Sequence, residues 1–193
     1  MKESSANLEE PGEVTGQMSE EIVKLGKMQL QEGLTYDQVV YLFVEQTDGI
    51  VRDTMRSFKR EFDDVEQSKL PKMEEELHYL FLFALDYLWQ QSPSYTQEQK
   101  RILQKVLFYH LDVGFGDDAQ GQVAWNALQE RFITYGQIVN EQKDDSAKLH
   151  SFAAKLSEYC GVGYLHFAIL VPSLFKTALD TVSVLKADKR RPK

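Results

Sequence analysis

The chain has 193 residues, a formal net charge of -8, an isoelectric point near 5.1 and 42% hydrophobic residues. This length and apolar content suffice for one domain with a packed core. The acidic balance excludes a protein whose whole surface binds nucleic acid or an anionic membrane, although a local basic patch is compatible with it. Cys160 is the only cysteine, which excludes an intramolecular disulfide and a cysteine-rich zinc site. We therefore expect a cytoplasmic protein.

Glycine and proline fall between stretches of helical periodicity, which predicts an all-α, single-domain bundle of about seven helices. Residues 1–17 are acidic and lack an apolar run, so we expect a disordered acidic leader there. The single domain is expected over residues 18–187 and a basic frayed tail over residues 188–193. The first helix is expected from about Ser19 to a stop at Gly33.

The second helix has the clearest start signal. Thr35 and Gln38 have the spacing of a capping box. Thr47, Asp48 and Gly49 then either break this helix or merely weaken it, and both outcomes stay open. Beyond them the apolar stripe continues at spacings of four and three, with Val51, Met55, Phe58, Phe62 and Val65.

Residues 71–90 are nearly all apolar and begin with a proline, which suits a first helical turn, so they are expected to form the central buried helix. The apolar runs 77–89 and 161–175 are shorter than the roughly 20 residues that a membrane span needs, so we expect no span. Thr96 and Gln99 form a second capping box. Pro172 should kink the last helix or split it in two.

The two remaining helices are expected to start at acidic caps. Asp117 or Asp118 can begin the fifth helix, and Asp144 can begin the sixth. Gly161 follows the sixth helix, where a glycine commonly ends a helix.

Four polar residues lie inside apolar stretches, namely His78, Asp86, His110 and His166. A polar group that is buried without a partner costs about 1 to 3 kcal/mol, so each of them needs a partner or water. If they converge, they line a candidate pocket, because perturbed titratable groups gather in functional clefts. If they do not converge, each is satisfied separately by a backbone carbonyl or lies at the edge of the core.

Glu75 and His78 have the Glu-x-x-His spacing that helical di-metal sites use. Such a site needs the motif twice, and the sequence has it once. The simpler interpretation is that Glu74, Glu75 and Glu76 form a solvated first turn, where acids interact favourably with the helix dipole. We therefore assign no metal ligand, cofactor or catalytic residue. A metal- or ligand-dependent helical-bundle enzyme remains an alternative, centred on Glu75, His78, Asp86 and His110.

Residues 35–60 also fit a helix-turn-helix with its turn near Gly49. The second helix would present cations that could contact phosphates or base edges, namely Arg52, Arg56, Lys59 and Arg60. The acids among them favour an amphipathic helix with a mixed-charge wet face instead. A DNA-binding transcriptional regulator is therefore an alternative hypothesis.

A short stretch containing Gly161, Val162, His166 and Phe167 resembles the opening of the penultimate helix of bacterial globins. The resemblance would place an iron-ligating histidine about one helical turn before this stretch. Ser157 stands there. The resemblance therefore implies a haem-free sensor related to that fold rather than a haem protein.

The sequence has enough apolar residues for a large hydrophobic core. It contains no short catalytic motif of the phosphate-loop, nucleophile-elbow or zinc-protease type. The leading hypothesis is accordingly a non-enzymatic regulatory or partner-binding protein. Its expected partner is another protein or a small apolar ligand bound in its core. The stripes at residues 51–65 and 125–139 can pack within the bundle or across a homodimer, so the oligomeric state stays open.

Overall fold

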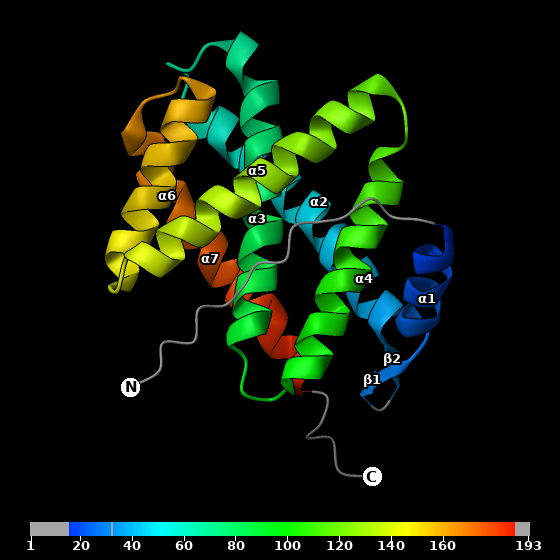
Figure 1. Ribbon diagram of the computed structural model, residues 1–193. Helices are drawn as coiled ribbons and strands as arrows, with labels where there is room; N and C mark the ends of the chain where they lie inside the picture. Colours follow the sequence, from blue (N-terminus) through cyan, green and yellow to red (C-terminus); the bar gives the residue numbers. More distant parts are fainter. Residues whose placement is uncertain (1–15, 32, 188–193) are drawn as a thin grey trace.

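The computed structural model describes residues 16–31 and 33–187; the basic tail predicted at residues 188–193 and nearly all of the predicted leader lie outside them. Within the described residues the chain forms seven α-helices and a two-stranded hairpin, which confirms the all-α bundle (Figure 1). The elements are α1 (Gly16–Gly26), β1 (Gln29–Gln31), β2 (Leu34–Thr35), α2 (Tyr36–Glu61), a 3-10 turn (Gln67–Lys69), α3 (Leu70–Gln91), α4 (Gln97–Phe115), α5 (Ala119–Glu141), α6 (Asp145–Cys160) and α7 (Tyr164–Ala187).

Helix α3 is the centre of the fold, as its apolar composition predicts. It packs against α2, α4, α5, α6 and α7. In Figure 1 it runs through the middle of the molecule, with α5 crossing in front of it, while α1 lies at the edge against α4. Its largest fully buried side chains include Leu77, Phe81 and Trp89. A helix that is apolar on almost every side is stable in water only when other helices surround it.

The predicted helix starts are confirmed in detail. Both capping boxes form, with Thr35 paired to Gln38 at the start of α2 and Thr96 paired to Gln99 at the start of α4. The side chain of Asp118 accepts a hydrogen bond from the Gly121 backbone and caps α5. Asp144 caps α6 in the same way through the Ala147 backbone. Each such cap satisfies a backbone N–H that has no partner within the helix.

The first helix ends earlier than expected. We predicted a stop at Gly33, but α1 ends at Gly26 and the chain turns into the antiparallel hairpin β1–β2. Asp37 lies against Gly26 so closely that a Cβ there would stand 2.0 Å from its carboxylate oxygen. Gly33 instead occupies the hairpin turn with φ of +82°, a conformation that glycine adopts without steric cost.

Helix α2 is continuous through Thr47, Asp48 and Gly49, so these residues do not break it. The hydroxyl of Thr47 donates to the carbonyl of Phe43 one turn earlier, which satisfies this buried group inside the helix. Burial of Val51 and the apolar positions beyond it outweighs the propensity cost of one helical glycine, about 1 kcal/mol. The helix-turn-helix prediction needs a turn near Gly49. This turn does not form, because the two predicted helices are one continuous helix.

Helix α7 is a single helix with Pro172 inside it, so the proline does not split it. Its segment Tyr164–Leu185 is long and apolar enough to cross a membrane by length and composition. The apolar run on which our expectation of no span rests, residues 161–175, covers only part of this helix, which continues past Pro172 to Ala187. Only 28% of that window is buried, so most of an unusually apolar helix lies at the surface.

Candidate functional site

A cleft opens where α2, α3, α4 and α5 meet, with a volume of about 380 Å³. Two of the four predicted pocket residues, His78 of α3 and His110 of α4, line it. The complete lining is Val44, Thr47, Asp48, Glu75, His78, Tyr79, Leu82, His110, Leu111, Gly114, Phe115 and Ala124.

The floor of this four-helix cleft is apolar and its rim is polar. Leu82, Leu111 and the ring of Tyr79 belong to the buried core, so their exposed edges form a preformed apolar surface. Val44 and Phe115 add partly buried apolar side chains to it. Ligand sites of small molecules commonly combine an apolar lining with a few polar groups of fixed position.

His78 links α3 to α2 across the rim. Its Nδ1 lies 2.7 Å from the Glu74 carbonyl oxygen, and its Nε2 lies 3.3 Å from a carboxylate oxygen of Asp48. Both ring nitrogens therefore face oxygen atoms, one on α3 and one on α2. The pair is partly exposed to solvent, with 28% of the His78 side chain accessible.

His110 links α4 to α2 in a similar way. Its Nε2 lies 3.0 Å from a carboxylate oxygen of Asp37 in the first turn of α2. Two histidines of the cleft are thus each held by an aspartate of the same helix. Helix α2 is tied to α3 by the first pair and to α4 by the second.

Glu75, like His78, is a residue of α3 that lines the rim of the cleft. Its carboxylate accepts hydrogen bonds from Tyr79 at 2.7 Å and from Lys72 at 2.8 Å. Partial burial favours the neutral acid, but these two donors outweigh it and lower the pKa of Glu75. Burial, with the neighbouring carboxylate, raises the pKa of Tyr79, so its hydroxyl stays protonated and donates.

Behind this rim lies a buried ion pair that sequence reasoning missed. Glu76 is fully buried and accepts two hydrogen bonds of 2.9 Å from Arg131 of α5. The guanidinium also stacks on the ring of Tyr159, 3.6 Å from its centroid. We took Glu74, Glu75 and Glu76 for a solvated first turn, which is wrong for Glu76. The available signal was an acid and an arginine that each interrupt an apolar stripe.

Cys160, at the end of α6, borders the same region. It is buried, and burial together with the charge of Glu76 raises the pKa of its thiol to about 12. The Tyr135 hydroxyl is also buried and has no hydrogen-bond partner among the described residues. The region around the Glu76–Arg131 pair is therefore closed to solvent, and the two charged side chains have a fixed arrangement.

Asp86 and His166 lie away from the cleft. Asp86 is buried and accepts hydrogen bonds from the amides of Gln90 and Gln104, at 3.3 and 3.0 Å. Burial raises the pKa of Asp86 to about 6, although both amides oppose this shift. His166 contacts Asp64 at 3.3 Å and the ring of Phe62, at the opposite end of α2 from the hairpin. The sequence-predicted set therefore divides into a pair at the cleft and two separate residues.

The cations proposed for DNA contact are all exposed on the last turns of α2. Arg56 pairs with Asp53 at 2.9 Å, and the Arg60 side chain donates to the Arg56 carbonyl. Arg52 and Lys59 lie on the same helix. Asp53, which lies between them, and Glu61, which follows them, give this surface mixed charge.

Glu75 and His78 each have other partners: Glu75 accepts from Tyr79 and Lys72, and His78 lies against Asp48 and the Glu74 carbonyl. No group of three or more histidine, cysteine, aspartate or glutamate side chains with metal-binding geometry occurs in residues 16–31 and 33–187. Chemically, the four-helix cleft offers an apolar surface bordered by polar side chains that already have partners.

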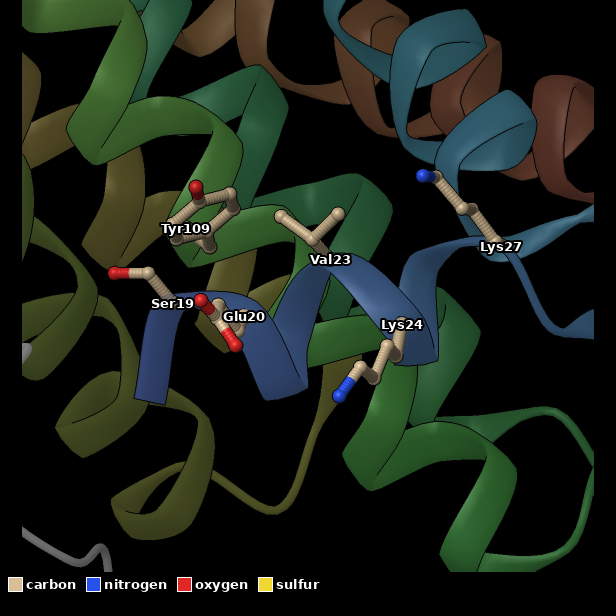
Figure 2. A pocket seen from close by; sticks show the side chains of 6 residues that line it. All are labelled: Ser19, Glu20, Val23, Lys24, Lys27 and Tyr109. Carbon is tan, nitrogen blue, oxygen red and sulfur yellow. The ribbon is translucent and has the colours of Figure 1, made fainter. Parts of the chain in front are cut away.

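A second, more superficial depression lies between α1 and α4 and is lined by Ser19, Glu20, Val23, Lys24, Lys27 and Tyr109. Figure 2 shows the Tyr109 ring beside Ser19 and Val23 on one side of α1, while Lys27 lies beyond the end of that helix. Its volume, about 370 Å³, is similar to that of the cleft. It lacks the buried floor that helices α2 to α5 give the cleft.

The comparisons with known proteins place this chain in no family: no family model matches it, and no curated protein or solved structure matches it.

Proposed function

We propose that this protein is a non-enzymatic regulatory protein that binds a small, mainly apolar ligand in the four-helix cleft. The observation that carries the proposal is the combination of a preformed apolar floor, lined by Tyr79, Leu82 and Leu111, with a rim whose polar side chains already have partners. Because these polar side chains already have partners, an apolar molecule can occupy the floor without leaving a buried polar group unpaired.

The rim suggests how binding would act on the rest of the protein. Asp48 and Asp37 connect α2 to α3 and α4 through His78 and His110. A ligand between these helices contacts all of them at once. Such a ligand changes an equilibrium only if it binds one arrangement of the helices more tightly than another. The partly exposed histidine–aspartate pairs, each worth about 1 kcal/mol or less, are weak enough to permit this change.

The test uses a neutral apolar fluorophore, N-phenyl-1-naphthylamine, together with a variant that fills the cleft. Gly114 lines the cleft, and a Cβ added there meets no atom within 4 Å. Gly114→Leu therefore adds an isobutyl group where the ligand would lie. Gly136 is the matched control, because it is also helical and open to a Cβ but does not line the cleft.

We expect saturable fluorophore binding to the wild type and to Gly136→Leu, and binding weakened by at least about tenfold in Gly114→Leu. Unfolding in urea checks that both variants fold. Equal binding by all three proteins would place the fluorophore elsewhere and contradict the proposal. So would the absence of saturable binding to the wild type.

A further inference from the structure

The side chains that can donate hydrogen bonds in the four-helix cleft already have acceptors within the protein. The Tyr79 hydroxyl donates to the Glu75 carboxylate, and the Thr47 hydroxyl donates to a backbone carbonyl of its own helix, both at 2.7 Å. The remaining donors of the lining are the rings of His78 and His110. A neutral imidazole has one N–H, and each ring has an oxygen atom within 3.3 Å for it. The lining therefore has no side-chain donor to spare for a ligand.

The lining does have acceptors to spare. Its two acids are Asp48 and Glu75, and a carboxylate offers about four acceptor positions. Glu75 accepts two hydrogen bonds, and one oxygen of Asp48 contacts His78. A ligand can reach both carboxylates, because 57% of the Asp48 side chain and 39% of the Glu75 side chain are accessible. A polar group of the ligand therefore finds acceptors at the rim.

The two carboxylates border the same part of the rim. His78 contacts Asp48 at 3.3 Å, and Glu75 precedes His78 by about one turn of α3. The nearby cations do not line the cleft: Lys72 is shared by two carboxylates of α3, and Arg52, one turn after Asp48, is exposed on α2. Among the described residues, no lysine or arginine lines the cleft. The surface that a ligand meets there is therefore negative.

Two aromatic residues of the lining act in the same direction. Tyr79 and Phe115 contribute to the apolar surface, and the negative face of an aromatic ring attracts a cation. An anionic group has the opposite interactions at this rim. It is repelled by the carboxylates, and it exchanges its hydration for a lining without spare donors, which is costly. The rim therefore distinguishes ligands of equal apolar size by their charge.

We propose that the ligand of the four-helix cleft is an apolar amine, and that apolar carboxylates of the same size are rejected. This inference rests on the proposed function and adds the chemical class of the ligand to it. The apolar body lies on the floor formed by Leu82 and Leu111, and the ammonium group lies at the rim beside Asp48 and Glu75. An ammonium group supplies N–H donors and no acceptor, which is what this rim lacks.

The experiment compares three competitors that share a naphthyl body and differ in charge: 1-naphthylmethylamine, 1-naphthylmethanol and 1-naphthoic acid. At neutral pH they are cationic, neutral and anionic. Each is titrated against the wild-type protein with bound N-phenyl-1-naphthylamine. We expect the amine to displace the fluorophore at the lowest concentration and the acid at the highest, with a ratio of at least about tenfold at low salt. Added salt should reduce this ratio.

The double variant Asp48→Asn with Glu75→Gln tests the two carboxylates. It should bring the amine and the acid to within about threefold of one another, while binding of the neutral fluorophore stays the same. The matched control is Glu45→Gln with Asp53→Asn, which removes the same two charges from exposed positions of α2 outside the cleft. This control should keep the wild-type ratio. Urea unfolding verifies that both double variants fold.

Three results would overturn the inference and leave the proposed function in place. They are equal displacement by all three competitors, stronger displacement by the acid, and a preference for the amine that survives Asp48→Asn with Glu75→Gln. A different result refutes the proposed function and this inference together: fluorophore binding that is absent, or that Gly114→Leu does not weaken. The ranking of the competitors is measured on the wild type, so it does not depend on the folding of any variant.

Discussion

Helix α3 buries two acids, and their partners differ. Glu76, near its start, is bound by the guanidinium of Arg131 through two hydrogen bonds of 2.9 Å and lies 3.0 Å from Lys72. Asp86, ten residues later, is bound within the described part of the chain by the side-chain amides of Gln90 and Gln104 alone. Both carboxyl groups are excluded from water. A cation can neutralise a buried charge, whereas an amide can only solvate it.

Because their buried acids have different partners, the two ends of α3 respond differently to a change of conditions. The Glu76–Arg131 pair keeps α3 and α5 in one relative position, because separating the pair leaves a buried charge alone. At the other end, protonation removes the buried charge of Asp86, since its pKa is raised to about 6. The Glu76 end of α3 is therefore fixed against α5, whereas the charge at the Asp86 end changes under mildly acidic conditions.

The largest expected effect comes from removing one partner of the fixed pair. Arg131→Met should lower the free energy of unfolding by about 3 to 5 kcal/mol, because Glu76 is then buried beside Lys72 alone. Urea unfolding measures this loss. Arg101→Met, the same change at an exposed arginine of α4, should change stability by less than about 0.5 kcal/mol.

The double variant Glu76→Leu with Arg131→Met sharpens this result. Apolar replacement of both partners should recover most of the loss, because no charge then remains buried in the pair's place. If the double variant is as unstable as Arg131→Met alone, the stabilisation comes from the stacking of Arg131 on Tyr159 and not from the ion pair.

The second effect concerns Asp86 and depends on pH. Its carboxyl takes up a proton more readily in the folded state, with a pKa of about 6, than at its usual value of 3.8. The folded state therefore binds more protons between about pH 4 and pH 6, and stability should fall across this window as pH rises. The shift corresponds to a contribution of about 2 to 3 kcal/mol, present below the window and lost above it.

Asp86→Asn removes this contribution. The difference in unfolding free energy between wild type and variant should change across pH 4 to 6 and then become constant. At neutral pH the variant should be more stable by roughly 1 to 2 kcal/mol, because an amide is buried at less cost than a carboxylate. Stability curves of the two proteins that run parallel over this pH range would contradict the prediction.

The smallest effect is expected at the rim of the cleft, where the pairs are partly exposed. Asp48→Asn removes the partner of His78 and should cost no more than about 1 kcal/mol, with a smaller loss at high salt. Unfolding in urea at low and high salt measures it, and Glu45→Gln, at an exposed acid of the same helix, is the control. A loss of unfolding free energy as large as that of Arg131→Met would mean that the Asp48–His78 pair stabilises the fold as much as the buried Glu76–Arg131 pair does.

Much of the fold could be predicted because the responsible signals are local. The caps at Thr35, Thr96, Asp118 and Asp144 depend on residues only three positions apart, and the nearly complete apolarity of residues 71–90 identified α3 as the central helix. The end of α1 could not be predicted in this way. It depends on the contact between Gly26 and Asp37, which local periodicity does not encode.

The candidate site was harder to predict for the same reason. That His78 and His110 face one cleft while Asp86 and His166 do not depends on how α2, α3 and α4 pack. Asp48 became the partner of His78 only because α2 is continuous, so a residue that the sequence marks as a helix weakener joins the rim. Likewise, the buried charge of Glu76 could be recognised only together with Arg131 of α5.

Because Cys160 is buried, the reactivity of its thiol reports on the opening of the surrounding helices. A thiol reacts with alkylating reagents as the thiolate, and a pKa of about 12 leaves almost none of that form at neutral pH in the folded state. Labelling at this single position therefore requires the α6–α7 region to open. Its rate measures the free energy of that opening, so a ligand that holds the helices closed becomes visible as slower labelling.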